Sequence, residues 1–148
     1  MGESKIYDNN VNQIYFDESK NHYHINLNNI SNDDNYNDIV NCLYDNYKKK
    51  QYFSVHVETK HLERRKIKMI YLYKLASFLK KLKKEPQRYL KKTTIHIYDD
   101  FTNNLLYTLF TFLSSPIAVV EIVYFNCREH NNDPSLIRKI KHYFPHNI

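Results

Sequence analysis

The sequence predicts an α/β domain whose mixed, mostly parallel sheet carries helices mainly on one face. Short runs of alternating apolar and polar residues are separated by segments with helical periodicity, which is typical of βαβ units. The chain has 148 residues, 42% of them hydrophobic, and this is enough for one core. Polar residues interrupt the predicted strands at alternate positions, so one sheet face is expected to lack a helical cover; they are His56, Glu58, His96 and Glu121.

The first third of the chain predicts an arm, a hairpin and a helix. Residues 1–12 are polar and lack an apolar period, so we expect a flexible N-terminal arm before a single domain over 13–148. Two alternating runs, 14–16 and 23–27, flank a polar turn and predict a β-hairpin. A helix is then expected through Tyr36 to Tyr47, capped by Asn32, Asp33 or Asp34.

Helices and strands alternate through the rest of the chain. Strands are predicted over 51–58, where apolar and polar residues alternate, and over 93–98 and 118–125. Between them we expect a long helix over 67–82 and a short one over 103–113.

A terminal helix is predicted after Asp133-Pro134, because proline favours the first helical position. Its apolar face would comprise Leu136, Ile137, Ile140 and Tyr143. The predicted order is therefore β-β-α-β-α-β-α-β-α.

Composition excludes several classes of protein. A single glycine rules out both glycine-rich nucleotide-binding loops. The two cysteines, Cys42 and Cys127, lack the spacing of a metal site and are expected to be free thiols. No apolar run is long enough for a membrane span or signal core, so the sequence favours a soluble cytoplasmic protein.

Eight histidines raise the question of a metal site. His22 and His24 share one strand face, while His56 and His96 lie mid-strand on the polar side. Zinc catalysis needs three converging ligands, and neither an HExxH nor an HxE…CxxC pattern is present. The sequence therefore predicts no metal, no cofactor and no catalytic residue. The acidic pair Asp99-Asp100 is expected to cap a helix near Thr102.

The order of elements resembles that of the STAS domains, the fold of the bacterial anti-sigma factor antagonists. Within that group the chain is most similar to the phosphoprotein family that regulates biofilm formation, often called SiaC-like. The similarity covers roughly residues 13–101 and is carried by Ile14-Tyr15-Phe16-Asp17, Ile25, Ser31, the 36–47 helix, Val55-His56-Val57-Glu58 and Tyr98-Asp99-Asp100. It implies a non-enzymatic regulatory module that binds a protein partner.

The turn after the third strand carries the switch of that family, a run of serines and threonines that a kinase phosphorylates. The corresponding residues 61–66 contain no hydroxyl group, and Thr59 is the nearest candidate. The resemblance therefore implies a module without its switch, with Glu63 as a fixed carboxylate and neighbouring cations as donors. The expected partner-binding residues are His61, Glu63, Arg64, Arg65, Lys66 and Lys68. These are otherwise ordinary solvated residues of a first helical turn.

The sequence is also compatible with two functions other than a regulatory module. Residues 60–92 carry a net charge of +11, within a chain of net charge +6, so a basic nucleic-acid or anionic-surface binder is one of them. Its anion-binding residues would be Lys80, Lys81, Lys83, Lys84, Arg88, Lys91 and Lys92. The other is a structural subunit of a larger assembly, for example a viral one or a homodimer, in which the open sheet face is buried.

Overall fold

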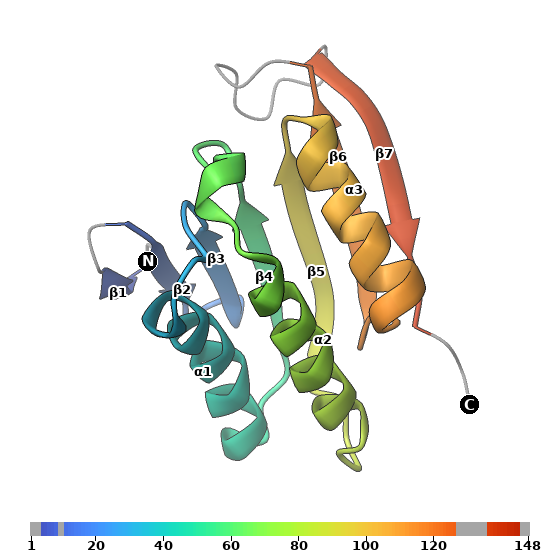
Figure 1. The fold of residues 1–148 in the computed structure, drawn as a ribbon. Helices are drawn as coiled ribbons and strands as arrows, with labels where there is room; N and C mark the ends of the chain where they lie inside the picture. The colour runs from blue at the N-terminus through green and yellow to red at the C-terminus, as the bar shows by residue number, and fades with distance from the viewer. Residues whose placement is uncertain (1–3, 9–10, 127–135, 146–148) are drawn as a thin grey trace.

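The computed structural model describes residues 4–8, 11–126 and 136–145. Its strands are β1 (Ser4–Asp8), β2 (Gln13–Asp17), β3 (His22–Asn26), β4 (Phe53–Glu58), β5 (Leu90–Ile97), β6 (Val119–Phe125) and β7 (Ile137–Tyr143). Its helices are α1 (Asp33–Lys49), α2 (Met69–Lys83) and α3 (Asp100–Thr108), with a 3₁₀ turn η1 (Arg64–Lys66) and a π-helical turn η2 (Leu109–Leu113). Figure 1 shows their arrangement.

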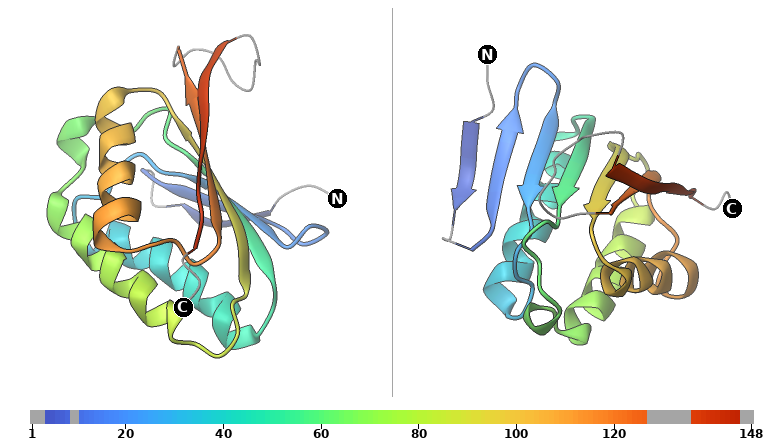
Figure 2. Two further views of the ribbon diagram at one scale, coloured as in Figure 1. Left: turned by 90° about the vertical axis from the view of Figure 1, so that its right-hand side faces the viewer. Right: turned by 90° about the horizontal axis from the view of Figure 1, so that it is seen from above.

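The strands form one sheet in strictly sequential order, β1 to β7. Strands β3 to β6 run parallel, whereas β1, β2 and β7 add antiparallel edges. Right-handed crossovers between neighbouring parallel strands, taken always in the same direction across a sheet, place every connecting helix on the same side. Figure 2 shows α1, α2 and α3 on one face of the sheet and none on the other.

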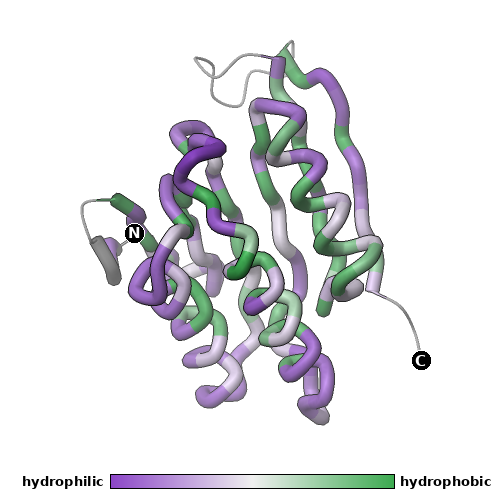
Figure 3. Tube along the Cα trace, in the orientation of Figure 1, coloured by the Kyte–Doolittle hydropathy of each residue, from purple (hydrophilic) through white to green (hydrophobic). Residues whose placement is uncertain are grey.

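The core lies between that helical layer and the sheet. Ile25, Val55, Ile95 and Ile122 point inward from the four parallel strands and are buried. Hydrophobic residues accordingly gather along the central strands, while the ends of α1 and α2 and the loops after them are hydrophilic (Figure 3). One face of each strand therefore supplies the main core. The opposite face holds a second, smaller cluster of buried residues near β5 and β6, made of Tyr98, Val123 and Phe125.

Local signals set the helix boundaries where the sequence predicts them. Asn32 caps α1 by accepting a hydrogen bond from the Asn35 backbone N–H. Asp99 likewise caps α3 by accepting one from the Thr102 backbone N–H, which confirms a structural role for this acidic residue. The predicted hairpin, central strands and first three helices are all present, with boundaries that differ by a few residues.

The N-terminal segment departs from the prediction of a flexible arm. Ser4–Asp8 form β1, paired antiparallel with β2. Asn12 is only 1% exposed and is held by hydrogen bonds to the loop after β3. A polar run without periodicity can still form an edge strand, because backbone pairing with one neighbour needs no apolar pattern.

The predicted terminal helix is wrong. Ile137–Tyr143 form β7, paired antiparallel with β6, and Asp133-Pro134 lies outside the described residues. Strand β6 is buried from Ile122 to Phe125, so without a neighbour its outer backbone groups would be left unpaired. Pairing with β7 satisfies them, and this tertiary demand overrides the helical spacing of the apolar residues.

The buried thiol of Cys42 supports a first prediction. Burial in α1, with a smaller effect of the nearby Asp45 carboxylate, raises the pKa of this thiol to about 12. In a Cys127→Ser variant, Cys42 is expected to react with an aromatic disulfide reagent at pH 8 about 1,000-fold more slowly than in the denatured chain, because the thiolate is the reactive form. Absorbance of the released thiol measures both rates, and equal rates would contradict the burial of Cys42.

Candidate functional site

Polar side chains gather on the sheet face that none of the described helices covers. Strand alternation directs His22, His24 and Asn26 of β3 outward, as well as His56 and Glu58 of β4. Together with residues of the flanking loops they line a solvent-open hollow of about 680 Å³. This histidine hollow comprises Gln13, His22, His24, Asn26, Asn28, His56, Glu58, Lys60, His61 and His96.

Strand register brings three of these histidines into a row. His24 on β3 lies directly opposite His56 on β4, and their rings stack with centroids 4.7 Å apart. The His56 ring meets that of His96 on β5 edge to face, with centroids 4.1 Å apart. The sequence alone does not show whether these histidines meet. The register of the parallel strands brings them together.

A carboxylate lies beside this row. Glu58 is opposite His96 in the ladder, and its Oε2 is 3.1 Å from His96 Nδ1. Both side chains are largely buried, at 17% and 8% exposure respectively. Burial by itself raises the pKa of Glu58, but the polar contacts of its carboxylate with His96 and Tyr98 outweigh it and the pKa is lowered. The Glu58 carboxylate is therefore ionised at neutral pH.

His56 is held in its neutral form. Burial, together with the neighbouring rings of His96 and His24, lowers the pKa of its imidazole to about 3. A neutral imidazole has a lone pair that can accept a hydrogen bond or bind a metal ion. One ligand atom from each of His56, Glu58 and His96 lies within 4.8 Å of the others. Sequence reasoning placed both histidines on the polar face but did not find Glu58 as their partner, although its i, i+2 spacing from His56 is the signal.

The predicted partner-binding residues do not form a single cluster. His61 lines the hollow, whereas Arg64 lies over the ring of Phe101 on α3, 4.7 Å from its centroid. Glu63 and Arg65 form an exposed ion pair at 2.6 Å. The remaining two, Lys66 and Lys68, use their backbones to bind Ile30, with Lys66 accepting a hydrogen bond and Lys68 donating one. Residues 61–68 thus run from the end of β4 to the start of α2, and His61 lies apart from the Arg and Lys side chains of this segment.

Thr59, the nearest hydroxyl to the predicted switch, is engaged in the core. Its side chain is buried and its hydroxyl donates a hydrogen bond of 2.6 Å to the backbone carbonyl of His96. Phosphorylation would require an exposed hydroxyl, whereas that of Thr59 is buried.

Four of the seven predicted anion-binding residues have partners within the chain. Lys83 donates to the backbone and side chain of Ser115, and Arg88 reaches the carbonyl of Ile117. Lys91 lies over the ring of Tyr52, and Lys92 pairs with Glu121 at 3.7 Å. The other three predicted residues are exposed at the end of α2; they are Lys80, Lys81 and Lys84. The basic stripe is therefore partly used for tertiary contacts.

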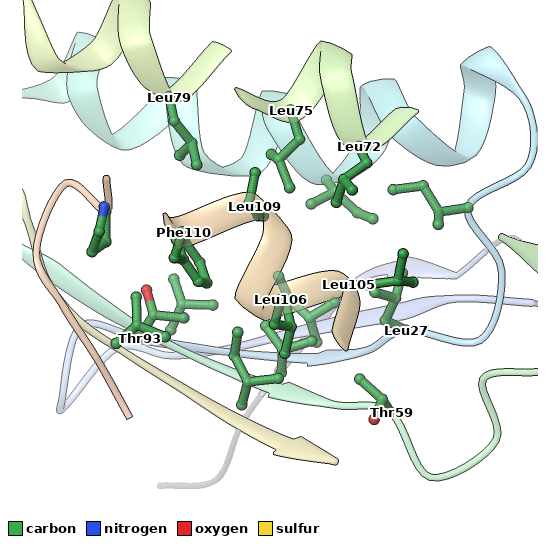
Figure 4. Close-up of a pocket in the computed structure, with 18 of the residues that line it drawn as sticks. Leu27, Thr59, Leu72, Leu75, Leu79, Thr93, Leu105, Leu106, Leu109 and Phe110 are labelled. Carbon is green, nitrogen blue, oxygen red and sulfur yellow. The ribbon is translucent and has the colours of Figure 1, made fainter. Parts of the chain in front are cut away.

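A second, apolar cavity of about 190 Å³ lies inside the core. Leu72, Leu75 and Leu79 of α2 enter it from one side, and Leu105, Leu106 and Leu109 from α3 and η2 (Figure 4). None of the described residues that line it is charged, so it offers mainly dispersion contacts and no ionic group to orient a ligand. The polar hollow is therefore the better candidate for chemistry.

No helix in the described ranges is both long and apolar enough to cross a membrane. Comparison of the chain with protein-family models, with curated proteins and with solved structures found no match.

Proposed function

We propose that this chain is a non-enzymatic, STAS-like protein-interaction module that binds an acidic partner without a phosphorylation switch. Its contact surface comprises the η1 turn and the outer face of the first turns of α2. We call this the α2 docking surface, made of Arg65, Lys66, Lys68, Met69, Ile70 and Tyr73. The sequential sheet with helices on one face supports the STAS-like part of the proposal.

Exposed apolar side chains at the start of α2 carry the proposal. Met69, Ile70 and Tyr73 are 43%, 57% and 55% exposed. They are close in sequence and on one helix, where i, i+3 and i, i+4 spacing creates a continuous patch. Apolar and aromatic side chains at the centre of a surface, with charged residues around them, are typical of protein interfaces.

The charge around this patch specifies the kind of partner. Arg65, Lys66 and Lys68 precede α2, whose first turn contains no acidic residue. The N-terminus of α2 adds a partial positive charge to the charges of these three side chains. A partner surface that carries carboxylates around aliphatic or aromatic residues is complementary to both features.

Selection of displayed peptides against the tag-free chain, in buffer with a metal chelator, tests this proposal. We expect enriched peptides to combine Asp or Glu with large apolar residues. Their affinity for a Lys68→Ala, Ile70→Ala variant should fall about tenfold or more, because an anchor and a complementary charge are both lost.

A matched control is Lys84→Ala, Phe112→Ala, which removes an exposed cation and an exposed aromatic ring elsewhere. It should bind the same peptides with unchanged affinity. Selections that yield no acidic peptides, or peptides that bind both variants equally well, would rule out the α2 docking surface. Binding of nucleic acid that is lost on replacing Lys80, Lys81 and Lys84 would favour the anionic-surface alternative instead.

A further inference from the structure

We propose that His56, Glu58 and His96 bind a divalent transition-metal ion, with Zn²⁺ as the best fit. This metal site goes beyond the interaction module, because it lies on the opposite, uncovered side of the sheet. All three residues line the histidine hollow.

The spacing of the ligand atoms suits a tetrahedral ion. With Zn²⁺ bonds of about 2.0–2.1 Å, two ligand atoms of a tetrahedron lie about 3.3 Å apart. The 3.1 Å between Glu58 Oε2 and His96 Nδ1 is close to this edge length. An ion can therefore replace the proton that these two atoms share, with release of that proton to solvent. The ligand atom of His56 lies within 4.8 Å of the other two, so a side-chain movement of up to about 1.5 Å completes the set.

The donor types select the class of metal. Two imidazole nitrogens and one carboxylate oxygen are typical of zinc and other late first-row metals, whereas Ca²⁺ and Mg²⁺ prefer oxygen ligands alone. The hollow is open to solvent above these residues, so water can occupy a fourth coordination position.

Surrounding contacts hold the ligands in place. The His24 ring stacks on His56 and limits its rotation. The Thr59 hydroxyl bonds the backbone carbonyl of His96. Such outer contacts orient ligands and are a general feature of protein metal sites.

A second histidine–carboxylate pair on the same face provides a matched control. His142 of β7 lies 3.1 Å from Glu121 of β6, the same distance as between His96 and Glu58. Only the Glu58 pair has a second imidazole within reach among the described residues. A site that depends on three converging ligands should therefore form at Glu58 and not at Glu121.

Titration of the tag-free full chain with Zn²⁺, in competition with a chromophoric chelator, tests the site. We expect one ion per chain with micromolar or tighter affinity, and no binding of Ca²⁺. Glu58→Gln and His56→Asn should each weaken Zn²⁺ binding by about 10–100-fold or more, because each removes a direct ligand. His142→Asn should leave the affinity unchanged.

A measurement on the unmodified chain keeps the proposal testable if a variant fails to fold. The imidazole ¹⁵N resonances of His56 and His96 should shift on addition of one equivalent of Zn²⁺, while those of His142 stay in place. Absence of saturable one-to-one binding, or binding that leaves the His56 and His96 resonances unmoved, would overturn the site. The peptide selections contain a chelator, so this result and that of the docking test are independent.

Discussion

Replacing Asn12 by alanine is expected to destabilise the native state by about 2–4 kcal/mol. The Asn12 Oδ1 accepts hydrogen bonds from the backbone N–H groups of Asn28 and Asn29, at 2.7 and 3.0 Å. Its Nδ2 donates to the Asn29 carbonyl at 2.8 Å. Alanine leaves these partly buried backbone groups without a partner, and each such group costs about 1–3 kcal/mol.

Chemical denaturation of three variants measures this effect. Asn12→Asp keeps the acceptor but loses the donor, so an intermediate loss of stability is expected. Asn37→Ala replaces an exposed asparagine on α1 and should change the free energy of unfolding by less than about 0.5 kcal/mol. If Asn12→Ala is as stable as Asn37→Ala, the residue does not hold the loop. Because Asn28 lines the histidine hollow, loss of Asn12 should also loosen one wall of it.

The main architecture was predictable because its signals are local and repeated. In β4, Phe53 and Val55 alternate with Ser54 and His56, which specifies both a strand and the side of it that faces the core. The same alternation indicated a sheet with one uncovered face, and the sequential strand order explains why the helices all lie on the other.

The ends of the sheet were not predictable in the same way. Both edge strands, β1 and β7, take their conformation from the neighbour that they pair with. None of the seven residues of β7 is fully buried, so this strand leaves no apolar pattern. In β7, Ile140 is 51% exposed although its spacing from Ile137 and Tyr143 fits a helix. In a segment of only seven residues, apolar residues can lie three or four positions apart by chance.

The candidate metal site was predictable only in part. The sequence placed His56 and His96 on the polar side of two strands, but whether they meet depends on register. A shift of one residue in the pairing of β4 with β5 would reverse the faces that meet and separate Glu58 from His96. Convergence of side chains across neighbouring strands is a tertiary property, so it required the structure.

Amide hydrogen exchange along residues 139–143, where the pairing of β7 with β6 is regular, is expected to alternate between slow and fast. Strand β7 is the last in the sheet and has a neighbour, β6, on one side only. In an antiparallel pair, every second residue directs its N–H toward the partner, and the others face solvent at an edge. The protected amides should therefore exchange about 100-fold or more slowly than their immediate neighbours in sequence.

Strand β6 serves as the internal control, because it pairs with β5 on one side and β7 on the other. Its consecutive amides from Val120 to Tyr124 should all be protected. A helix over residues 137–143 would instead protect consecutive amides once its first turn is complete, since each N–H bonds four residues back. Uniform slow exchange from Lys141 to Tyr143 would thus restore the helix that the apolar spacing predicts, and with it an unpaired edge on β6.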